Sequence, residues 1–195
     1  TSVAIDAGRI LVGAPLRDVG GKVDAGAVDV FDWNGASWVP SQVLSAPSPQ
    51  QTQHFGFAVA LDGDSALCGG PFKQVLSSKA GQAFVFVENT GSWVHQATLS
   101  AAPLNLWTGG FGAAVALSGD RAAVGAPYGG SGLTVAFLRS GTTWIAEDII
   151  DPRGPDPSGY NSAQYGHSVC MSGDCMLAGA PVAVVPWPMD SGSAQ

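Results

Sequence analysis

Four short stretches decide the fold of this sequence: Gly13-Ala14-Pro15, Gly69-Gly70-Pro71, Gly125-Ala126-Pro127 and Gly179-Ala180-Pro181. They recur at intervals of 56, 56 and 54 residues along the 195-residue chain. A fixed period of this length is typical of supersecondary units that stack on one another. The sequence therefore contains four copies of one unit, and we call these stretches the triplets.

Each triplet closes a pair of short apolar segments joined by a tight turn. The turns are Ala7-Gly8, Gly63-Asp64, Gly119-Asp120 and Gly173-Asp174. Glycine adopts the positive φ that a two-residue turn needs, so every copy is expected to begin with a β-hairpin. In three copies an aromatic-glycine dipeptide precedes this hairpin: Phe55-Gly56, Phe111-Gly112 and Tyr165-Gly166.

Two further strands are expected after the triplet in the first three copies. The third strand opens at a glycine, namely Gly26, Gly81 or Gly132, and the fourth at a tryptophan, namely Trp38, Trp93 or Trp144. The first two strands are expected to carry no charged residue and to be covered on both faces, whereas the fourth carries charge, as suits an outer edge. Repeated units of four antiparallel strands are typical of propeller blades, so the fold class is all-β.

The first strand of each copy has large residues on one face and small residues on the other. The large residues are Val3 and Ile5, Val59 and Leu61, Val115 and Leu117, and Val169 and Met171. The small residues are Ala4, Ala60, Ala116 and Cys170. We expect the large face of one unit to interdigitate with the small face of its neighbour.

The order of an aromatic-glycine dipeptide, a hairpin, a triplet, a glycine-led strand and a Gly-x-x-Trp turn resembles the FG-GAP repeat family over essentially the whole chain. This resemblance implies a β-propeller of the kind found in integrin α-subunit heads, with seven blades and an extracellular location, secreted or on the cell surface. The repeats are more similar to the bacterial tandem form, because the turn at Ser118-Gly119-Asp120 lacks the Asp-x-Asp-x-Asp-Gly insertion that binds calcium in integrin blades.

The expected strands make about three and a half blades in a single partial propeller spanning residues 1–195. The repeats run approximately over residues 1–54, 55–110, 111–164 and 165–195. A ring needs more blades than this, so it is completed either by the remainder of a longer chain or by a second copy. A half ring on its own would expose apolar end faces, and we expect it to self-associate.

Composition excludes several classes of partner. The chain has 8 Lys and Arg against 15 Asp and Glu, a net charge of −7, and no basic cluster that would bind the phosphates of a nucleic acid. No apolar run approaches the about 18 residues that span a bilayer, so no membrane insertion is expected.

Nothing in the sequence indicates a catalytic centre. The three histidines, His54, His95 and His167, do not have the spacing of zinc ligands. The only glutamates, Glu88 and Glu147, lie in different copies and do not form a paired acid and base. The protein is therefore expected not to be an enzyme.

Two pairs of residues are candidate structural or metal sites. Cys170 and Cys175 flank a turn, and a two-residue turn at Ser172-Gly173 would place them opposite each other; they form either a disulfide or part of the small-residue core. Asp18 and Asp24 lie in the glycine-rich loop after the first triplet, where they are either calcium ligands or solvated carboxylates. Calcium is the one cofactor that the sequence suggests.

Three tryptophans are not explained by the repeat: Trp33, Trp107 and Trp187. They either contact a protein or glycan ligand or fill gaps between blades. The leading hypothesis is an extracellular recognition, adhesion or scaffold module, and the alternative is a carbohydrate-binding, hemagglutinin-like lectin. A domain that only positions its neighbours is a third interpretation.

Overall fold

The computed structural model describes residues 2–74, 80–101, 109–150 and 164–181, which form fourteen strands and no helix. The first sheet consists of β1 (Val3–Asp6), β2 (Arg9–Ala14), β3 (Ala27–Trp33) and β4 (Trp38–Leu44). The second consists of β5 (Val59–Asp62), β6 (Ser65–Gly70), β7 (Gln82–Asn89) and β8 (Ser92–Leu99). The third consists of β9 (Ala114–Ser118), β10 (Arg121–Ala126), β11 (Leu133–Ser140) and β12 (Thr143–Ile150). The fourth holds β13 (Ser168–Ser172) and β14 (Cys175–Gly179).

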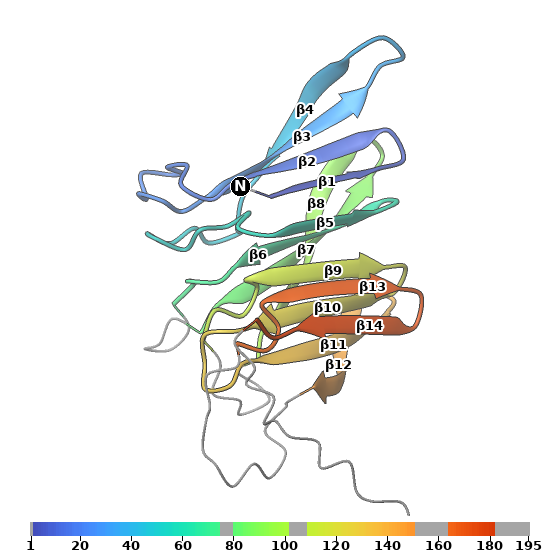
Figure 1. Ribbon diagram of the computed structural model, residues 1–195. Helices are drawn as coiled ribbons and strands as arrows, with labels where there is room; N and C mark the ends of the chain where they lie inside the picture. The colour runs from blue at the N-terminus through green and yellow to red at the C-terminus, as the bar shows by residue number, and fades with distance from the viewer. Residues whose placement is uncertain (1, 75–79, 102–108, 151–163, 182–195) are drawn as a thin grey trace, which may run out of the picture.

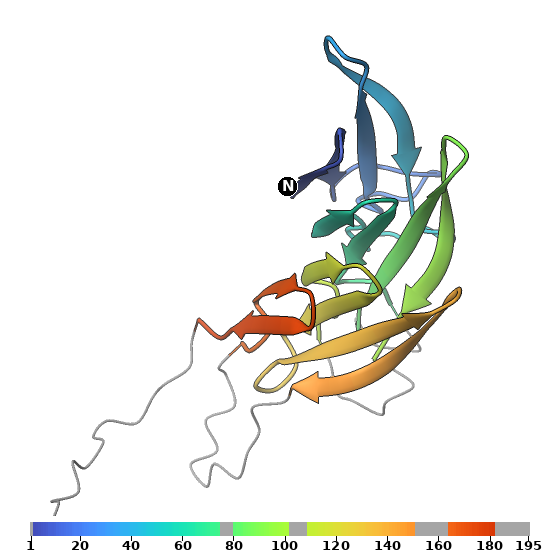
Figure 2. The same ribbon diagram turned by 90° about the vertical axis from the view of Figure 1, so that its right-hand side faces the viewer.

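Every sheet is an antiparallel meander in which strands pair in chain order. Three sheets have four strands and the described part of the fourth has two, so the predicted all-β repeat of four-stranded units is confirmed. The sheets stack face to face along the chain (Figure 1). Their first strands, β1, β5, β9 and β13, contact one another in succession, while the outer strands fan apart (Figure 2). This is a propeller-like arrangement.

The strands of every sheet run between the same two ends of the molecule, and each end is named here after the connections that lie there. The two-residue turns between first and second strands lie at what we call the hairpin end, on the right of Figure 1. Gly63, Gly119 and Gly173 have φ of 54°, 56° and 55° in these turns, which confirms the predicted hairpins. The triplets and the aromatic-glycine dipeptides lie at the opposite end, which we call the loop end.

Two hydrophobic clusters fill the spaces between sheets. Between the first and second sheets, Ala4 packs in one cluster with Val59 and Leu61. Between the second and third sheets, Ala60 packs in the other with Val115 and Leu117. The predicted contact of large residues with small ones is therefore confirmed at both interfaces.

At the loop end the triplet of one copy contacts the aromatic-glycine dipeptide of the next. Phe55 pairs as an isolated parallel bridge with Gly26 of the preceding copy, and the amide of Gly56 donates a hydrogen bond to the carbonyl oxygen of Gly69 within its own copy (2.9 Å). A Cβ atom on Gly13 would lie 2.0 Å from the carbonyl oxygen of Gly56. Glycine is therefore required where the two backbones touch.

The same contact recurs between later copies. A Cβ atom on Gly69 would lie 1.9 Å from the carbonyl oxygen of Gly112, and one on Gly125 would lie 2.0 Å from that of Gly166. The ring of Phe111, like that of Phe55, is fully buried beside this contact. The dipeptide and the triplet are thus the two halves of one contact between sheets.

We expect Gly69→Ala to lower the free energy of unfolding by about 3 kcal/mol, because the added methyl group overlaps backbone that cannot move aside. Gly20→Ala is the matched control, since Gly20 has a φ of 58° and nothing near its Cβ position. It should cost only the about 1 kcal/mol of a left-handed alanine. Urea denaturation measures both, and equal losses would contradict the proposed backbone contact.

Candidate functional site

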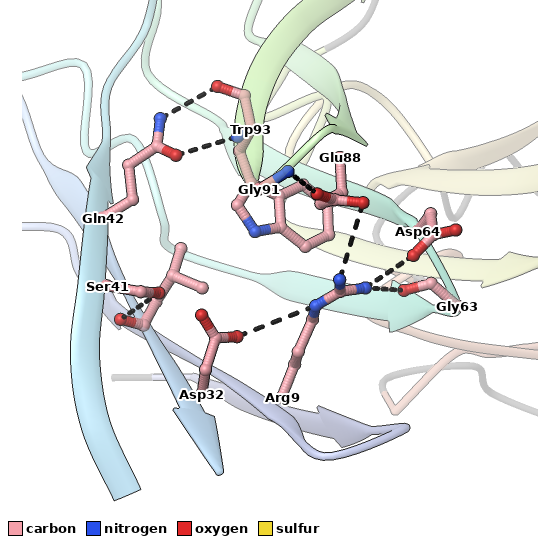
Figure 3. A network of polar contacts seen from close by, with 10 residues as sticks. Arg9, Asp32, Ser41, Gln42, Gly63, Asp64, Glu88, Gly91 and Trp93 are labelled. Atoms are coloured by element: carbon pink, nitrogen blue, oxygen red, sulfur yellow. Dashed lines mark hydrogen bonds and ion pairs between the residues drawn. The ribbon is translucent and has the colours of Figure 1, made fainter. Parts of the chain in front are cut away.

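Arg9 is the centre of a polar network at the hairpin end (Figure 3). It begins β2, directly after the turn, and its Nη1 donates to Oδ1 of Asp64 (2.6 Å) and to the carbonyl oxygen of Gly63 (3.4 Å) in the next sheet. Ion pairs join it to Asp32 (3.7 Å) and to Glu88 (3.6 Å). One arginine therefore joins carboxylates of its own sheet to those of the sheet that follows.

Arg9 and Gln42 cover Trp93, the second residue of β8. The guanidinium carbon of Arg9 lies 5.5 Å from the ring centroid of Trp93, and Gln42 of β4 bonds both backbone groups of Trp93, at 2.9 and 2.8 Å. Trp93 is consequently buried, although it lies at the tip of an outer hairpin. The first sheet thus provides the cover that this ring needs.

Side chains at the ends of first strands also bond the next turn. The amide of Gly63 donates to Oδ2 of Asp6 (2.6 Å), and the amide of Gly173 donates to Oγ of Ser118 (3.0 Å). Asp62 accepts the equivalent bond from Gly119. The turns of the second, third and fourth sheets are therefore each held by the sheet before them.

Between the third and fourth sheets Arg121 occupies the position of Arg9. Its Nε donates to Oδ1 of Asp174 (2.8 Å), and it pairs with Glu147. The second sheet has Ser65 at this position, and Arg139 of β11 bonds both Ser65 (3.0 Å) and Asp120 (2.6 Å) instead. An arginine therefore lies at each of the three interfaces, but it does not always come from the same sheet.

The expectation that the first two strands carry no charge is wrong. Strand β1 ends at Asp6, and β2 and β10 begin at Arg9 and Arg121. These residues lie next to the turns, where their side chains reach the neighbouring sheet and are paired. The recurrence of arginine just after the turn in copies one and three was the available signal.

Trp33 and Trp38 form an exposed aromatic pair on the hairpin that joins β3 to β4. They are register partners, and their ring centroids are 5.4 Å apart at an interplanar angle of 57°. Trp38 corresponds to the buried Trp93, but here no described sheet precedes it. The other candidate tryptophans, Trp107 and Trp187, lie outside the described residues.

Asp18 and Asp24 lie together in the loop between β2 and β3. The amide of Asp24, a residue with φ of 52°, donates to Oδ1 of Asp18 (3.0 Å), so this carboxylate serves its own loop. Arg17 nearby forms two hydrogen bonds with Asp29. Among the described residues, no three His, Cys, Asp or Glu side chains gather where they could hold a metal ion. Calcium binding stays a prediction.

The loop end carries an aromatic cluster that the sequence did not single out. The ring of Phe72 stacks on Tyr128 (6.1 Å between centroids, 7° between planes) and meets the edges of His54 (5.0 Å) and Phe57 (6.0 Å). We call these four residues the loop-end aromatic cluster. The position directly after each of the first three triplets is Leu16, Phe72 or Tyr128, a periodic signal that was present in the sequence.

Lys73 directly follows Phe72 in the chain and is buried. Its Nζ donates to the carbonyl oxygen of Ser48 (2.5 Å), which fixes the loop between β6 and β7 to the segment after β4. Burial lowers the pKa of the Lys73 amine. Phe72, at the centre of the cluster, is therefore held on a loop that is bonded to the segment after β4.

The expectation that Cys170 lies opposite Cys175 is wrong. The turn is Gly173-Asp174, so Cys170 pairs with Leu177 and Cys175 pairs with Ser172. Cys170 and Cys175 are diagonal neighbours on one face, and both are exposed free thiols. Cys68 is also a free thiol, but it is fully buried, which raises its pKa.

We expect Arg9→Ala to lower the free energy of unfolding by about 1–2 kcal/mol, because it removes packing on Trp93 as well as the ion pairs. Asp64→Ala is the comparison variant. It removes one ion pair with an exposed carboxylate and should cost less than about 0.5 kcal/mol, and that small loss should vanish at high salt. Urea denaturation at low and high salt separates the two. Equal and salt-sensitive losses would show that Arg9 acts only through surface charge.

One comparison with known proteins gives a match. The profile of the FG-GAP repeat family matches residues 38–86, which run from β4 into β7 and include both Phe55-Gly56 and Gly69-Gly70-Pro71. No curated protein matches the chain. In the described part of the chain, no helix is long and apolar enough to cross a membrane.

Proposed function

We propose that this chain, which contains an FG-GAP repeat, is a non-enzymatic recognition module of the extracellular adhesion or scaffold type. The family match is the observation that carries the proposal, because FG-GAP repeats suggest adhesion-type propeller modules. Fold alone does not define a function, so the proposal needs a surface that can bind.

We further propose that the stacked sheets are blades of a β-propeller closed by additional repeat units. The adjacent first strands and the fanned outer strands support this geometry (Figure 2). The blade number of seven, which the resemblance implies, stays a prediction.

The loop-end aromatic cluster is the best supported binding surface for a protein ligand. Tyr128 is 48% exposed and Leu16, at the same position of the first copy, is 65% exposed. Aromatic side chains on loops held by a rigid scaffold are typical of recognition surfaces. The ring of Phe72 stacks on the ring of Tyr128, so the exposed Tyr128 ring is held in place before a ligand binds.

The lectin alternative is favoured by one observation, the exposed pair of Trp33 and Trp38. Exposed indole rings are suited to stacking on the apolar faces of sugars. Trp33 has no tryptophan counterpart in the other copies, since the residues that pair with Trp93 and Trp144 as Trp33 pairs with Trp38 are Glu88 and Arg139.

Binding to arrays of extracellular matrix proteins and of glycans tests both functions. A protein ligand should lose about tenfold in affinity with Tyr128→Ala, and keep its affinity with Trp33→Ala. A glycan ligand that is lost with Trp33→Ala would establish the lectin instead. Val94→Ala, an exposed change on β8, is the matched control and should leave binding unchanged. An absence of binding to either array, or an equal loss with the control, would contradict the recognition proposal.

A further inference from the structure

One face of the first sheet is apolar and uncovered. Val3 and Ile5 of β1 are 67% and 66% exposed, and register places Ile5 opposite Ile10 and Ile10 opposite Phe31 on the same face. This face also holds Trp33, Trp38 and Val43, all exposed. A contiguous exposed face of this kind marks an interaction site.

The second sheet shows what such a face contacts when it is covered. Val59 and Cys68 correspond to Val3 and Val12, and they are 8% and 0% exposed. They are buried against Ala4 and Leu11, which belong to the opposite face of the first sheet. The large face of a sheet is thus built to receive the small face of another sheet.

The fourth sheet presents an uncovered small face. Cys170 corresponds to Ala4 and Ala60, and its register partner Leu177 corresponds to Leu11 and Leu67. Leu11 and Leu67 are 0% exposed, whereas Leu177 is 70% exposed. The described structure therefore ends in the two halves of the interface that it builds internally.

The polar positions of these two faces also match. At the internal interfaces an arginine bonds the aspartate of each turn, as Arg9 bonds Asp64. On the uncovered small face, Cys175 stands where Arg9 and Arg121 stand, and on the uncovered large face Gly8 stands where Asp64 stands. The large face also carries Asp29, the register partner of Val12 and Val43, and this carboxylate is paired with Arg17 of its own copy. Joining the two faces therefore buries no unpaired charge. Ser172 is at the position of Ser118, where its hydroxyl would accept a bond from the turn at Ala7-Gly8.

We propose that these faces bind each other between two copies of the chain, head to tail, with the β13–β14 face of one copy on the β1–β4 face of the next. The contact repeats the apolar packing and the turn hydrogen bonds of the internal interfaces, without their contact between triplet and dipeptide, and this continuity identifies the partner as a second copy. Such a heterologous contact closes into a ring or extends, depending on the rotation that it imposes. Two copies joined at both contacts would form a closed stack of eight sheets. The measured mass of the assembly gives the number of copies.

Charge substitutions on the two faces test the proposal by light scattering over a concentration series. The wild-type chain should have the mass of two or more copies, while Ile5→Asp and Leu177→Asp should each be monomeric. Both side chains are exposed, so the variants should fold, which circular dichroism and thermal melting check. Val94→Asp on β8 is the control and should associate as the wild type does.

A mixture of the two variants distinguishes head-to-tail contact from every other mode. The intact β13–β14 face of Ile5→Asp can bind the intact β1–β4 face of Leu177→Asp, so the equimolar mixture should form a 1:1 dimer and nothing larger. A wild-type monomer at all concentrations overturns the proposal. Association of either variant by itself also overturns the proposal, because each variant keeps only one of the two complementary faces intact.

Thiol reactivity supplies a second measurement. Cys170 and Cys175 lie on the proposed contact face and should react more slowly with a thiol reagent in the wild-type assembly than in monomeric Ile5→Asp. Cys68 is the internal reference, since it should react only on unfolding. Equal rates at Cys170 and Cys175 in the two proteins would contradict the contact. Array binding is a separate measurement, so the assembly and the proposed recognition function can fail independently.

Discussion

The close approach of two backbones at the loop end is the constraint on which the stack of sheets depends. Gly13 and Gly56 meet where a single Cβ atom would overlap a carbonyl oxygen, and Phe55 pairs as a parallel bridge with Gly26 of the preceding copy. Because the contact is made by backbone, it sets the separation of neighbouring sheets independently of the side chains in between. The aromatic ring of Phe55 then fills the space beside it.

The hairpin end holds the same sheets by a different chemistry. There, carboxylates and hydroxyls such as Asp6 and Ser118 accept bonds from the turn amides of the next sheet, and arginines pair with the turn aspartates. With both ends of each first strand attached to its neighbour, the apolar residues between them must fit a fixed gap. This explains why large residues such as Val59 meet small ones such as Ala4 at the interfaces on both sides of the second sheet.

The features that depend on local sequence were predictable, and those that depend on the meeting of distant copies were less so. The strands, the hairpin turns and the alternation of large and small residues follow from the period and from glycine. The pairing of Arg9 with Asp64 depends on how two sheets lie side by side, so the arginine was not recognised. The cysteines were misaligned for a simpler reason. Placing the turn at Gly173-Asp174, as in the other copies, moves the partner of Cys170 to Leu177.

The distribution of arginines has a consequence for how the units can be ordered. Arg9 and Arg121 bond the turn aspartate of the sheet that follows their own. At the middle interface, Arg139 instead bonds Asp120 of its own sheet and reaches back to Ser65 of the preceding sheet. The second unit, with Ser65, therefore offers no cation to its successor, and the third unit carries its own. Exchanging units would leave one turn aspartate without a cation and crowd two at another. The units are therefore similar but not interchangeable, and each one suits only its own place in the order.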